Sequence, residues 1–180
     1  MATHVWGKGN IQPFWDDQYK RLDYVKKPFN NPQDLIRWRR EGYTHSDELF
    51  TGYLCDMNSA QPDWSAQLME WFRDFFQVTD VGCSFYRMTT GTVLPVHSDT
   101  YSVYRQKFNC SVDSIVRAII MPEAWASGHY LEINSVPIHL WYPGDFYWWR
   151  GDTPHMAANI GVTDRYTFQL TGHIVDQNSQ

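Results

Sequence analysis

From Gly82 onward the sequence is a succession of short strand-like segments separated by turn residues. The segments are rich in β-branched and aromatic residues, which favour strands, and Gly, Pro, Asn and Asp mark the turns between them. They span 83–88, 92–97, 114–121, 129–133, 138–141, 146–149, 155–160 and 165–171. A series of short strands with regular turn signals predicts a mainly β fold, either a sandwich or a barrel.

Two helices are expected before the strands begin. Pro62–Phe76 is the clearest, because its apolar residues recur at intervals of three and four and form one stripe. Such a helix is expected to buttress the outside of a sheet. Pro32–Glu41 is expected to be a second, shorter helix, with Asn31 as its N-cap and Gly42 after its end.

The N-terminal part of the chain is less regular. Residues 1–31 mix aromatic residues with Gly, Asn and Pro without a sustained period, so they form either an ordered arm or a flexible lead. Residues 43–61 are expected to be a loop. Since 180 residues fit one domain, we expect a single domain over 1–180, with an arm and buttressing helices in 1–81 and a β core in 82–173.

Charge and composition exclude several classes of protein. The net charge is −5, with no run of five or more basic residues, which argues against broad nucleic-acid binding. No apolar stretch approaches the about 18 residues of a membrane span, and residues 1–7 lack the features of a signal peptide. Cys55, Cys83 and Cys110 are an odd number without C-x-x-C, so no disulfide framework or thiolate zinc site is expected. A cytoplasmic location fits these features.

Three residues have the chemistry of a metal site. His97 and Asp99 are two apart, so both side chains would leave the same face of an extended strand. With His155 they make two imidazoles and one carboxylate, the ligand set by which non-haem Fe(II) oxygenases hold one face of the metal. His155 lies far along the chain, so only the fold can bring it to the pair. The alternative is that both histidines are satisfied polar residues of a β-sandwich.

A second His-x-Asp pair, His45 and Asp47, lies in a segment without strand character, and we do not expect it to bind metal. Arg165 follows His155 by ten residues, and turn-forming residues lie between them. Two strands joined by that turn would place Arg165 across from His155, with Cβ atoms about 5 Å apart. A guanidinium beside a metal ligand suggests a carboxylate-bearing molecule that also contacts the metal.

The pattern of His97-x-Asp99, His155 and then Arg165 resembles the Fe(II)/2-oxoglutarate-dependent dioxygenases. The runs 144–145, 149–155, 159–161 and 165–169 are most similar to the aspartyl/asparaginyl β-hydroxylase-like and prolyl-hydroxylase-like branches. The resemblance covers roughly residues 82–173. Aspartyl/asparaginyl β-hydroxylases often lack the carboxylate ligand, whereas this chain has Asp99, so neither branch indicates the substrate.

The resemblance implies a double-stranded β-helix, also called a jelly roll or cupin-like fold. It implies Fe(II) held by His97, Asp99 and His155, together with 2-oxoglutarate and O2. The reaction would hydroxylate a C–H bond of a protein side chain (Pro, Asn or Asp) or of a small amino acid, with succinate and CO2 as co-products. In the family, the residue at Arg165 binds the far carboxylate of 2-oxoglutarate, with a hydroxyl such as that of Thr167 assisting.

The last predicted strand alternates in polarity. Arg165, Thr167, Gln169 and Thr171 share one face, and aromatic and apolar residues share the other. The polar row faces a cosubstrate pocket if it points inward; the alternative is that it faces solvent. Tyr86 matches the place of a cosubstrate-binding Tyr in prolyl-hydroxylase-like members.

Several further residues are candidates for substrate or cosubstrate binding. Arg117 lies among Ile and Val, where a charge needs a partner. That partner is either a carboxylate of 2-oxoglutarate or of an amino-acid substrate, or an Asp or Glu of the chain. Residues 99–109 are expected to form a loop over the site. The candidate substrate contacts are Tyr101, Tyr104, Arg105 and Trp148.

Two other functions compete with an oxygenase. A cupin-like metal-binding or substrate-binding protein without oxygenase activity would hold zinc or nickel in the same fold. A β-sandwich interaction module would bind no metal and would use some of its nine Trp residues to bind sugar or protein.

Overall fold

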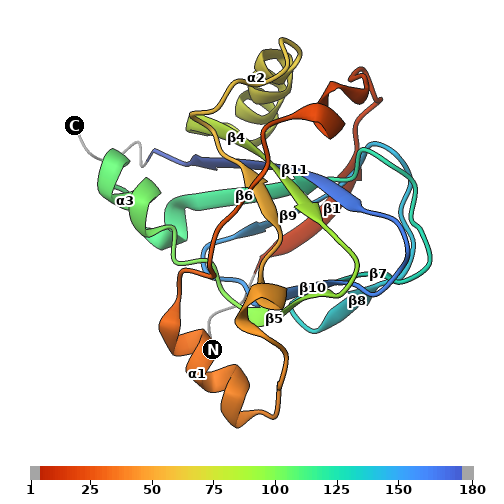
Figure 1. Ribbon diagram of the computed structural model, residues 1–180. Coiled ribbons are helices and arrows are strands. Elements are labelled where there is room, and N and C mark those ends of the chain that lie inside the picture. The colour runs from red at the N-terminus through yellow and green to blue at the C-terminus, as the bar shows by residue number, and fades with distance from the viewer. Residues whose placement is uncertain (1–4, 176–180) are drawn as a thin grey trace.

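The computed structural model describes residues 5–175, so part of the N-terminal stretch judged for a signal peptide lies outside the described residues. Two antiparallel sheets pack face to face (Figure 1). The larger sheet has the order β1 (Trp6–Asn10), β9 (Asp145–Arg150), β6 (Ile115–Ile120), β11 (Arg165–His173), β4 (Thr79–Met88), β3 (Tyr53–Cys55) and β2 (Val25–Lys26). The smaller sheet has the order β5 (Thr92–His97), β10 (His155–Asn159), β7 (His129–Ile133) and β8 (Val136–Ile138).

The strands of the β core alternate between the two sheets along the chain. β4, β6, β9 and β11 lie in the larger sheet, while β5, β10 and the β7–β8 hairpin lie in the smaller one. This alternation is the double-stranded β-helix, and the predicted mainly β fold with flanking helices is confirmed. No helix in residues 5–175 is long and apolar enough to cross a membrane.

Two apolar layers hold the fold together. The inner layer fills the space between the sheets with residues such as Ile119, Leu131 and Ile133. The outer layer lies on the opposite face of the larger sheet, where Phe168 projects from the centre of β11. The Phe168 ring contacts four aromatic rings with centroid distances of 5.1–5.2 Å. They belong to Trp15, Tyr19, Trp64 and Phe85.

Capping residues and apolar stripes in the sequence explain where α1 and α2 form. α1 (Pro32–Arg40) begins at the expected N-cap, where the Asn31 side chain accepts a hydrogen bond from the Gln33 N–H. α2 (Ser65–Phe76) begins three residues later than predicted and buries Leu68 and Phe72 against the larger sheet. The prediction that it buttresses the outside of a sheet is confirmed (Figure 1).

The N-terminal segment is an ordered arm, so the first of the two alternatives holds for the residues that the structure describes. β1 adds an edge strand to the larger sheet beside β9, and the 3-10 helix η1 (Asp17–Arg21) places Tyr19 in the outer apolar layer. The segment predicted as a loop, 43–61, contains the 3-10 helix η2 (Asp47–Phe50) and β3, which pairs with β4. A third 3-10 helix, η3 (Val112–Ser114), precedes β6.

Three local predictions were wrong. β10 and β11 do not form a hairpin, because they belong to opposing sheets, so Arg165 faces His155 across the sandwich instead of along a ladder. Asp99 is not on a strand, since β5 ends at His97. The segment after Asp99 is not a loop throughout, because Ser102–Phe108 forms α3.

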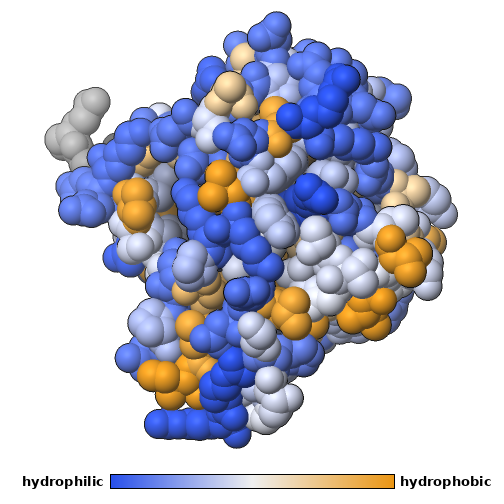
Figure 2. Space-filling model, in the orientation of Figure 1, coloured by the Kyte–Doolittle hydropathy of each residue, from blue (hydrophilic) through white to orange (hydrophobic). Residues whose placement is uncertain are grey.

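The surface seen in Figure 2 is mostly hydrophilic, and its hydrophobic side chains lie in small separate groups. Most of the large apolar side chains of residues 5–175 are buried in the two layers, which should carry most of the stability.

Replacing Phe168 with Ala should lower the free energy of unfolding by about 3–5 kcal/mol, because a fully buried ring is removed and leaves a cavity. Chemical denaturation of the purified protein measures this. The control is Val162→Ala, at a residue that is 95% exposed, where a change of less than about 0.5 kcal/mol is expected. Equal stability of the two variants would contradict the assignment of the outer layer as core.

Candidate functional site

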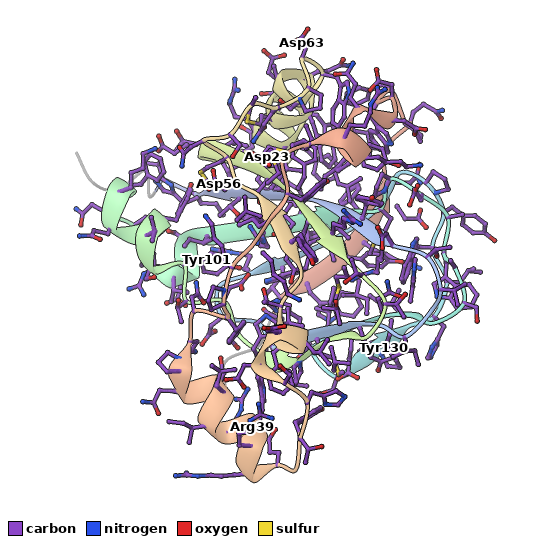
Figure 3. The ribbon with its side chains drawn as sticks, viewed as in Figure 1. Asp23, Arg39, Asp56, Asp63, Tyr101 and Tyr130 are labelled. Atoms are coloured by element: carbon purple, nitrogen blue, oxygen red, sulfur yellow. The ribbon has the colours of Figure 1, made fainter. Side chains whose placement is uncertain are left out.

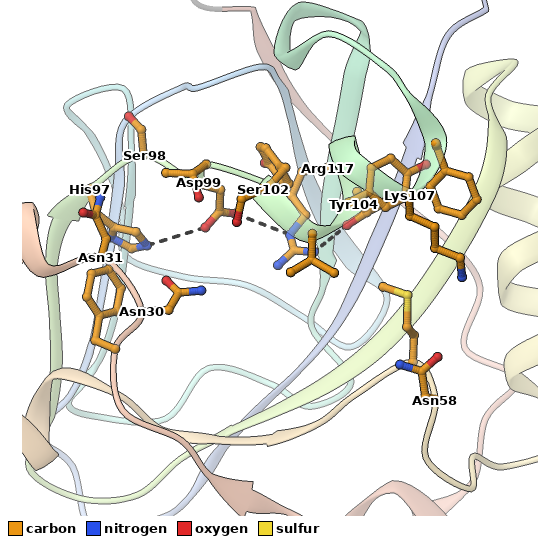
Figure 4. Close-up of a pocket in the computed structure, with 17 residues that line it drawn as sticks. Asn30, Asn31, Asn58, His97, Ser98, Asp99, Ser102, Tyr104, Lys107 and Arg117 are labelled. Atoms are coloured by element: carbon orange, nitrogen blue, oxygen red, sulfur yellow. Dashed lines mark hydrogen bonds and ion pairs between the residues drawn. The ribbon is translucent and has the colours of Figure 1, made fainter.

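His97, Asp99 and His155 lie together at one end of the smaller sheet. His97 is the last residue of β5, His155 is the first of β10, and the two are direct partners in the ladder. Their ring centroids are 4.3 Å apart. Asp99 reaches the pair from the turn after β5. One of its carboxylate oxygens lies 3.9 Å from Nε2 of His97 (Figure 4), and the other lies 4.0 Å from Nε2 of His155. One ligand atom from each residue lies within 4.8 Å of the others.

The backbone orients both imidazoles for metal binding. Nδ1 of His97 lies 2.8 Å from the Pro95 carbonyl, and Nδ1 of His155 lies 3.0 Å from the Thr153 carbonyl. Each Nδ1–H donates to its carbonyl, which leaves the Nε2 lone pair free and directed at Asp99. A histidine metal ligand usually has such a partner on its other nitrogen.

The protonation states also suit a cation. Burial, followed by the neighbouring His97, lowers the pKa of His155 to about 4, so the ring is neutral at neutral pH. Burial raises the pKa of Asp99, but His155, Arg117 and His97 together outweigh it and hold that pKa below its usual value. Neutral imidazoles and an ionised carboxylate are the forms that bind metal.

A cavity of about 310 Å³ between the sheets adjoins these three residues. Arg165 lines it and is only 3% exposed. The cavity also contacts the three site residues, and its walls combine polar and apolar side chains. Lining residues from the core strands include Tyr86, Met88, Leu94, Arg117, Ile119, Leu131, Trp149, Ala157, Arg165, Thr167 and Gln169. We call this space the Arg165 cavity.

Arg165 is a buried cation without an acidic partner among the described residues. Nη1 contacts the Met88 sulfur at 3.0 Å, and the guanidinium lies 5.4 Å from the Trp141 ring. Burial lowers the pKa of Arg165 to about 10, which still leaves it charged at neutral pH. A buried charge is costly unless it is paired, so the Arg165 cavity is suited to an anion.

Unsatisfied buried polar atoms gather at this site. Within residues 5–175, four buried side-chain nitrogen or oxygen atoms lack a hydrogen-bond partner. They are the Tyr101 hydroxyl, Arg117 Nε, Trp149 Nε1 and Arg165 Nε. Each of these residues lines the Arg165 cavity or a second cavity, described below, that also adjoins Asp99. Because buried donors are rarely left unpaired, their concentration here indicates that a polar ligand completes the site.

The polar row of β11 points inward, as one of the two alternatives predicted. Arg165, Thr167 and Gln169 line the Arg165 cavity, whereas Tyr166 and Phe168 pack in the outer layer. Tyr86 lies in the same cavity, and its hydroxyl accepts a hydrogen bond from the Gly52 N–H at 2.5 Å.

Of the two kinds of partner that the sequence left open for Arg117, the structure shows the acidic residue of the chain, which is Asp99. Its two terminal nitrogens donate to Thr171 at 2.5 Å and to Gln169 at 2.7 Å, and its Nε lies 3.8 Å from the Asp99 carboxylate (Figure 4). The pair with Asp99 exists, but it is too long for a hydrogen bond. Nε is therefore still unpartnered, and Arg117 lines both cavities.

A second cavity, of about 290 Å³, lies on the α3 side of Asp99 and is here called the α3 cavity. Tyr101 (labelled in Figure 3) and Tyr104 line it, in agreement with their predicted proximity to the site. The Tyr104 hydroxyl is engaged by the protein, since it donates to the Asp80 carbonyl at 2.9 Å. Arg105 is exposed on α3 and lines neither cavity, so the structure does not support it as a substrate contact.

The choice of Trp148 was wrong, because Trp149 is the tryptophan that faces the site. Trp149 pairs with the inward-facing Arg117, and its ring lies 4.6 Å from that of His155. Trp148 points to the opposite face of the sheet and packs on Phe76. Alternation predicted that only one of the two would face inward, but it does not say which one.

Sequence reasoning also missed the lining residues of the N-terminal arm. Lys27, Pro28, Phe29 and Asn30 all contact the Arg165 cavity, and the last two also line the α3 cavity. No periodicity marks these residues in the sequence. Only the path of the arm across the sandwich brings them to the site.

The sequence matches no protein-family model and no curated protein, but the fold is similar to solved structures. One is a Pseudomonas putida prolyl-4-hydroxylase, with a TM-score of 0.59 and 17% identity over 97% of this chain and 95% of that one. Another is a viral collagen prolyl hydroxylase from Paramecium bursaria Chlorella virus-1 in complex with 2-oxoglutarate, with a TM-score of 0.56 and 11% identity over 95% and 96%.

A third similar structure is an oxidoreductase of the 2-oxoglutarate–Fe(II) oxygenase family from Burkholderia pseudomallei. Its TM-score is 0.52, with 14% identity over 86% of this chain and 75% of that one. Similarity at this level of identity concerns the fold, and it agrees with the double-stranded β-helix predicted from the sequence.

His155→Ala is expected to abolish stoichiometric binding of Fe(II), because the three-residue ligand set loses a nitrogen. The loss should exceed the about 10–100-fold that follows removal of an outer partner of a metal ligand. Anaerobic equilibrium dialysis with metal analysis measures it.

The matched control for this variant is His45→Ala, which removes the exposed histidine of the other His-x-Asp pair. It should bind metal like the unmodified protein. Equal binding by the His155 and His45 variants would contradict the assignment of the site.

Proposed function

We propose that this protein is an Fe(II)/2-oxoglutarate-dependent dioxygenase that hydroxylates a C–H bond. The observation that carries the proposal is a buried Arg165, without an acidic partner in residues 5–175, in the same cavity as His97, Asp99 and His155. A metal site alone does not need a buried cation nearby. A molecule that chelates the metal at one end and carries a carboxylate at the other accounts for both features.

The named structures support the same proposal. All three are prolyl hydroxylases or oxygenases of the 2-oxoglutarate–Fe(II) type, and one is a complex with 2-oxoglutarate. Each resembles this chain over most of its length. The resemblance found in the sequence and the similarity of the folds thus point to one reaction class.

Each residue of the site has a defined task in this reaction. His97, Asp99 and His155 would hold Fe(II) through two imidazoles and one carboxylate, a ligand set that leaves coordination positions free for the cosubstrate. Arg165, with Thr167 beside it on β11, binds the far carboxylate of 2-oxoglutarate, and Tyr86 lines the same end of the cavity. These residues position the cosubstrate, and the apolar walls between the sheets keep bulk water from it.

Bound iron supplies the oxidising chemistry that no side chain can provide. One oxygen atom of O2 enters succinate as 2-oxoglutarate loses CO2, and the other becomes the hydroxyl group that replaces hydrogen on the substrate. The substrate class is a protein side chain such as Pro, Asn or Asp, or a small amino acid.

We infer a cytoplasmic location, since Cys55, Cys83 and Cys110 are free thiols and a reducing compartment preserves Fe(II).

Adding 2-oxoglutarate to the Fe(II)-loaded protein without oxygen should produce the weak visible absorption band of a keto acid chelated to iron. Arg165→Met should weaken 2-oxoglutarate binding by about 30-fold or more, because a buried charge pair is lost. Titration of the band gives the affinity.

The control is Arg40→Met, which removes an exposed arginine of α1 and should leave the titration unchanged. Absence of the band from a protein that does bind Fe(II) would overturn the dioxygenase proposal in favour of a cupin-like metal protein.

A further inference from the structure

The α3 cavity meets the Arg165 cavity at the metal site. His97, Asp99 and Arg117 line both spaces. If 2-oxoglutarate occupies the Arg165 cavity, as proposed above, a molecule in the α3 cavity reaches the site from the other side of Asp99. The α3 cavity is therefore the place from which a substrate C–H bond can approach.

The size of the α3 cavity limits what can enter it. Its volume of about 290 Å³ is just below the range of about 300–1,000 Å³ that is usual for pockets of drug-sized ligands. Apolar side chains, among them Phe29, Met57 and Phe108, form part of its wall. A small molecule with an apolar body fits this space.

The side chains that line the two cavities carry more positive than negative charge. Asp99 is the only acidic residue that lines either cavity, among the residues that the structure describes. Two guanidinium groups, those of Arg117 and Arg165, line them as well. Lys27 and Lys107 also contribute to the walls, but both side chains are exposed, so their charges are solvated and are left out of the balance. With Fe(II) and the dianion of 2-oxoglutarate bound, the positive charges of the metal and the two arginines exceed the negative charges by one.

Arg117 is the residue whose positive charge remains uncompensated. Its hydrogen-bond partners Thr171 and Gln169 are neutral, so they fix the guanidinium in place without compensating its charge. Asp99, at 3.8 Å, is its only acidic neighbour within the described part of the chain, and that carboxylate is committed to the metal. Arg117 Nε is buried and unpartnered, although a guanidinium can donate all five of its N–H groups.

From this geometry we propose that Arg117 binds the carboxylate of a small, apolar monocarboxylic substrate, such as a free amino acid, that occupies the α3 cavity. The proposal rests on the dioxygenase function, and it narrows the substrate class from a protein side chain or a small amino acid to a small free acid. Neutral polar groups of the α3 cavity, including Asn30 (Figure 4), are available for the polar part of such a molecule. The reacting carbon then lies within a few bonds of the carboxylate, because Arg117 is next to Asp99.

The first experiment compares acids with their amides. Zn(II) replaces Fe(II) so that nothing turns over, and 2-oxoglutarate is present throughout. Ligand-detected NMR then measures binding of L-valine, L-leucine, L-phenylalanine and L-proline and of the corresponding amides. At least one free acid should bind about tenfold or more tightly than its amide, as loss of a charge-assisted hydrogen bond predicts. The proposal is overturned if no acid binds, or if the amides bind equally well.

The second experiment tests Arg117 itself. Arg117→Met should weaken binding of the acid by about tenfold or more, with 2-oxoglutarate affinity within about threefold of the unmodified protein. Arg40→Met, with its exposed side chain, serves as the control. If Arg117→Met leaves acid binding unchanged, or weakens 2-oxoglutarate as strongly as Arg165→Met does, Arg117 does not bind the substrate.

The two proposals fail in different ways. If the unmodified protein binds metal but not 2-oxoglutarate, the dioxygenase function is wrong and the substrate class falls with it. If 2-oxoglutarate binds and the acids do not, only the substrate class is wrong. The comparison of acids with amides uses the unmodified protein, so it decides the matter even if Arg117→Met does not fold.

Discussion

The register of β11 against β4 and β6 determines which side chains enter the interior of the sandwich. With Phe168 opposite Phe85 and Ile120, the apolar residues of β11 fall on the outer face, and Arg165 and Thr167 fall on the inner one. Because side chains alternate along a strand, a slip of one residue would exchange the two faces. The same register brings Gln169 and Thr171 to Arg117, so the outer apolar layer indirectly fixes the position of a cation in the site.

The site itself opposes stability. Arg165 is buried without a counter-charge, and three further buried polar atoms near the metal ligands have no partner in residues 5–175. Each unsatisfied group costs about 1–3 kcal/mol. Such exceptions to good packing are typical of functional sites, and the dense aromatic packing around Phe168 offsets their cost. Binding of an anionic molecule would satisfy these groups and stabilise the fold.

Local sequence patterns predicted most elements because their causes are local. The stripe of α2, the cap of α1 at Asn31 and the bounds of β5 and β7 all follow from neighbouring residues. The errors occurred where a distant partner decides. The interval of ten between His155 and Arg165 was interpreted as a hairpin. Instead, β10 pairs with β7 in the smaller sheet, and β11 pairs with β6 in the larger one. Trp148 was chosen over Trp149 because alternation alone does not identify the inner face.

The sequence by itself determined the side chains of the candidate site. They are two histidines, a carboxylate and an arginine, in a β-rich chain whose pattern resembles one oxygenase superfamily. Only the tertiary structure decided that Arg165 has no acidic partner among residues 5–175, that Arg117 lies between two cavities, and that the N-terminal arm contributes to both. The physical reason is that charge compensation and cavity shape depend on side chains from several strands and from the arm. Their distances are set by how the two sheets pack, and no spacing along the chain specifies that packing.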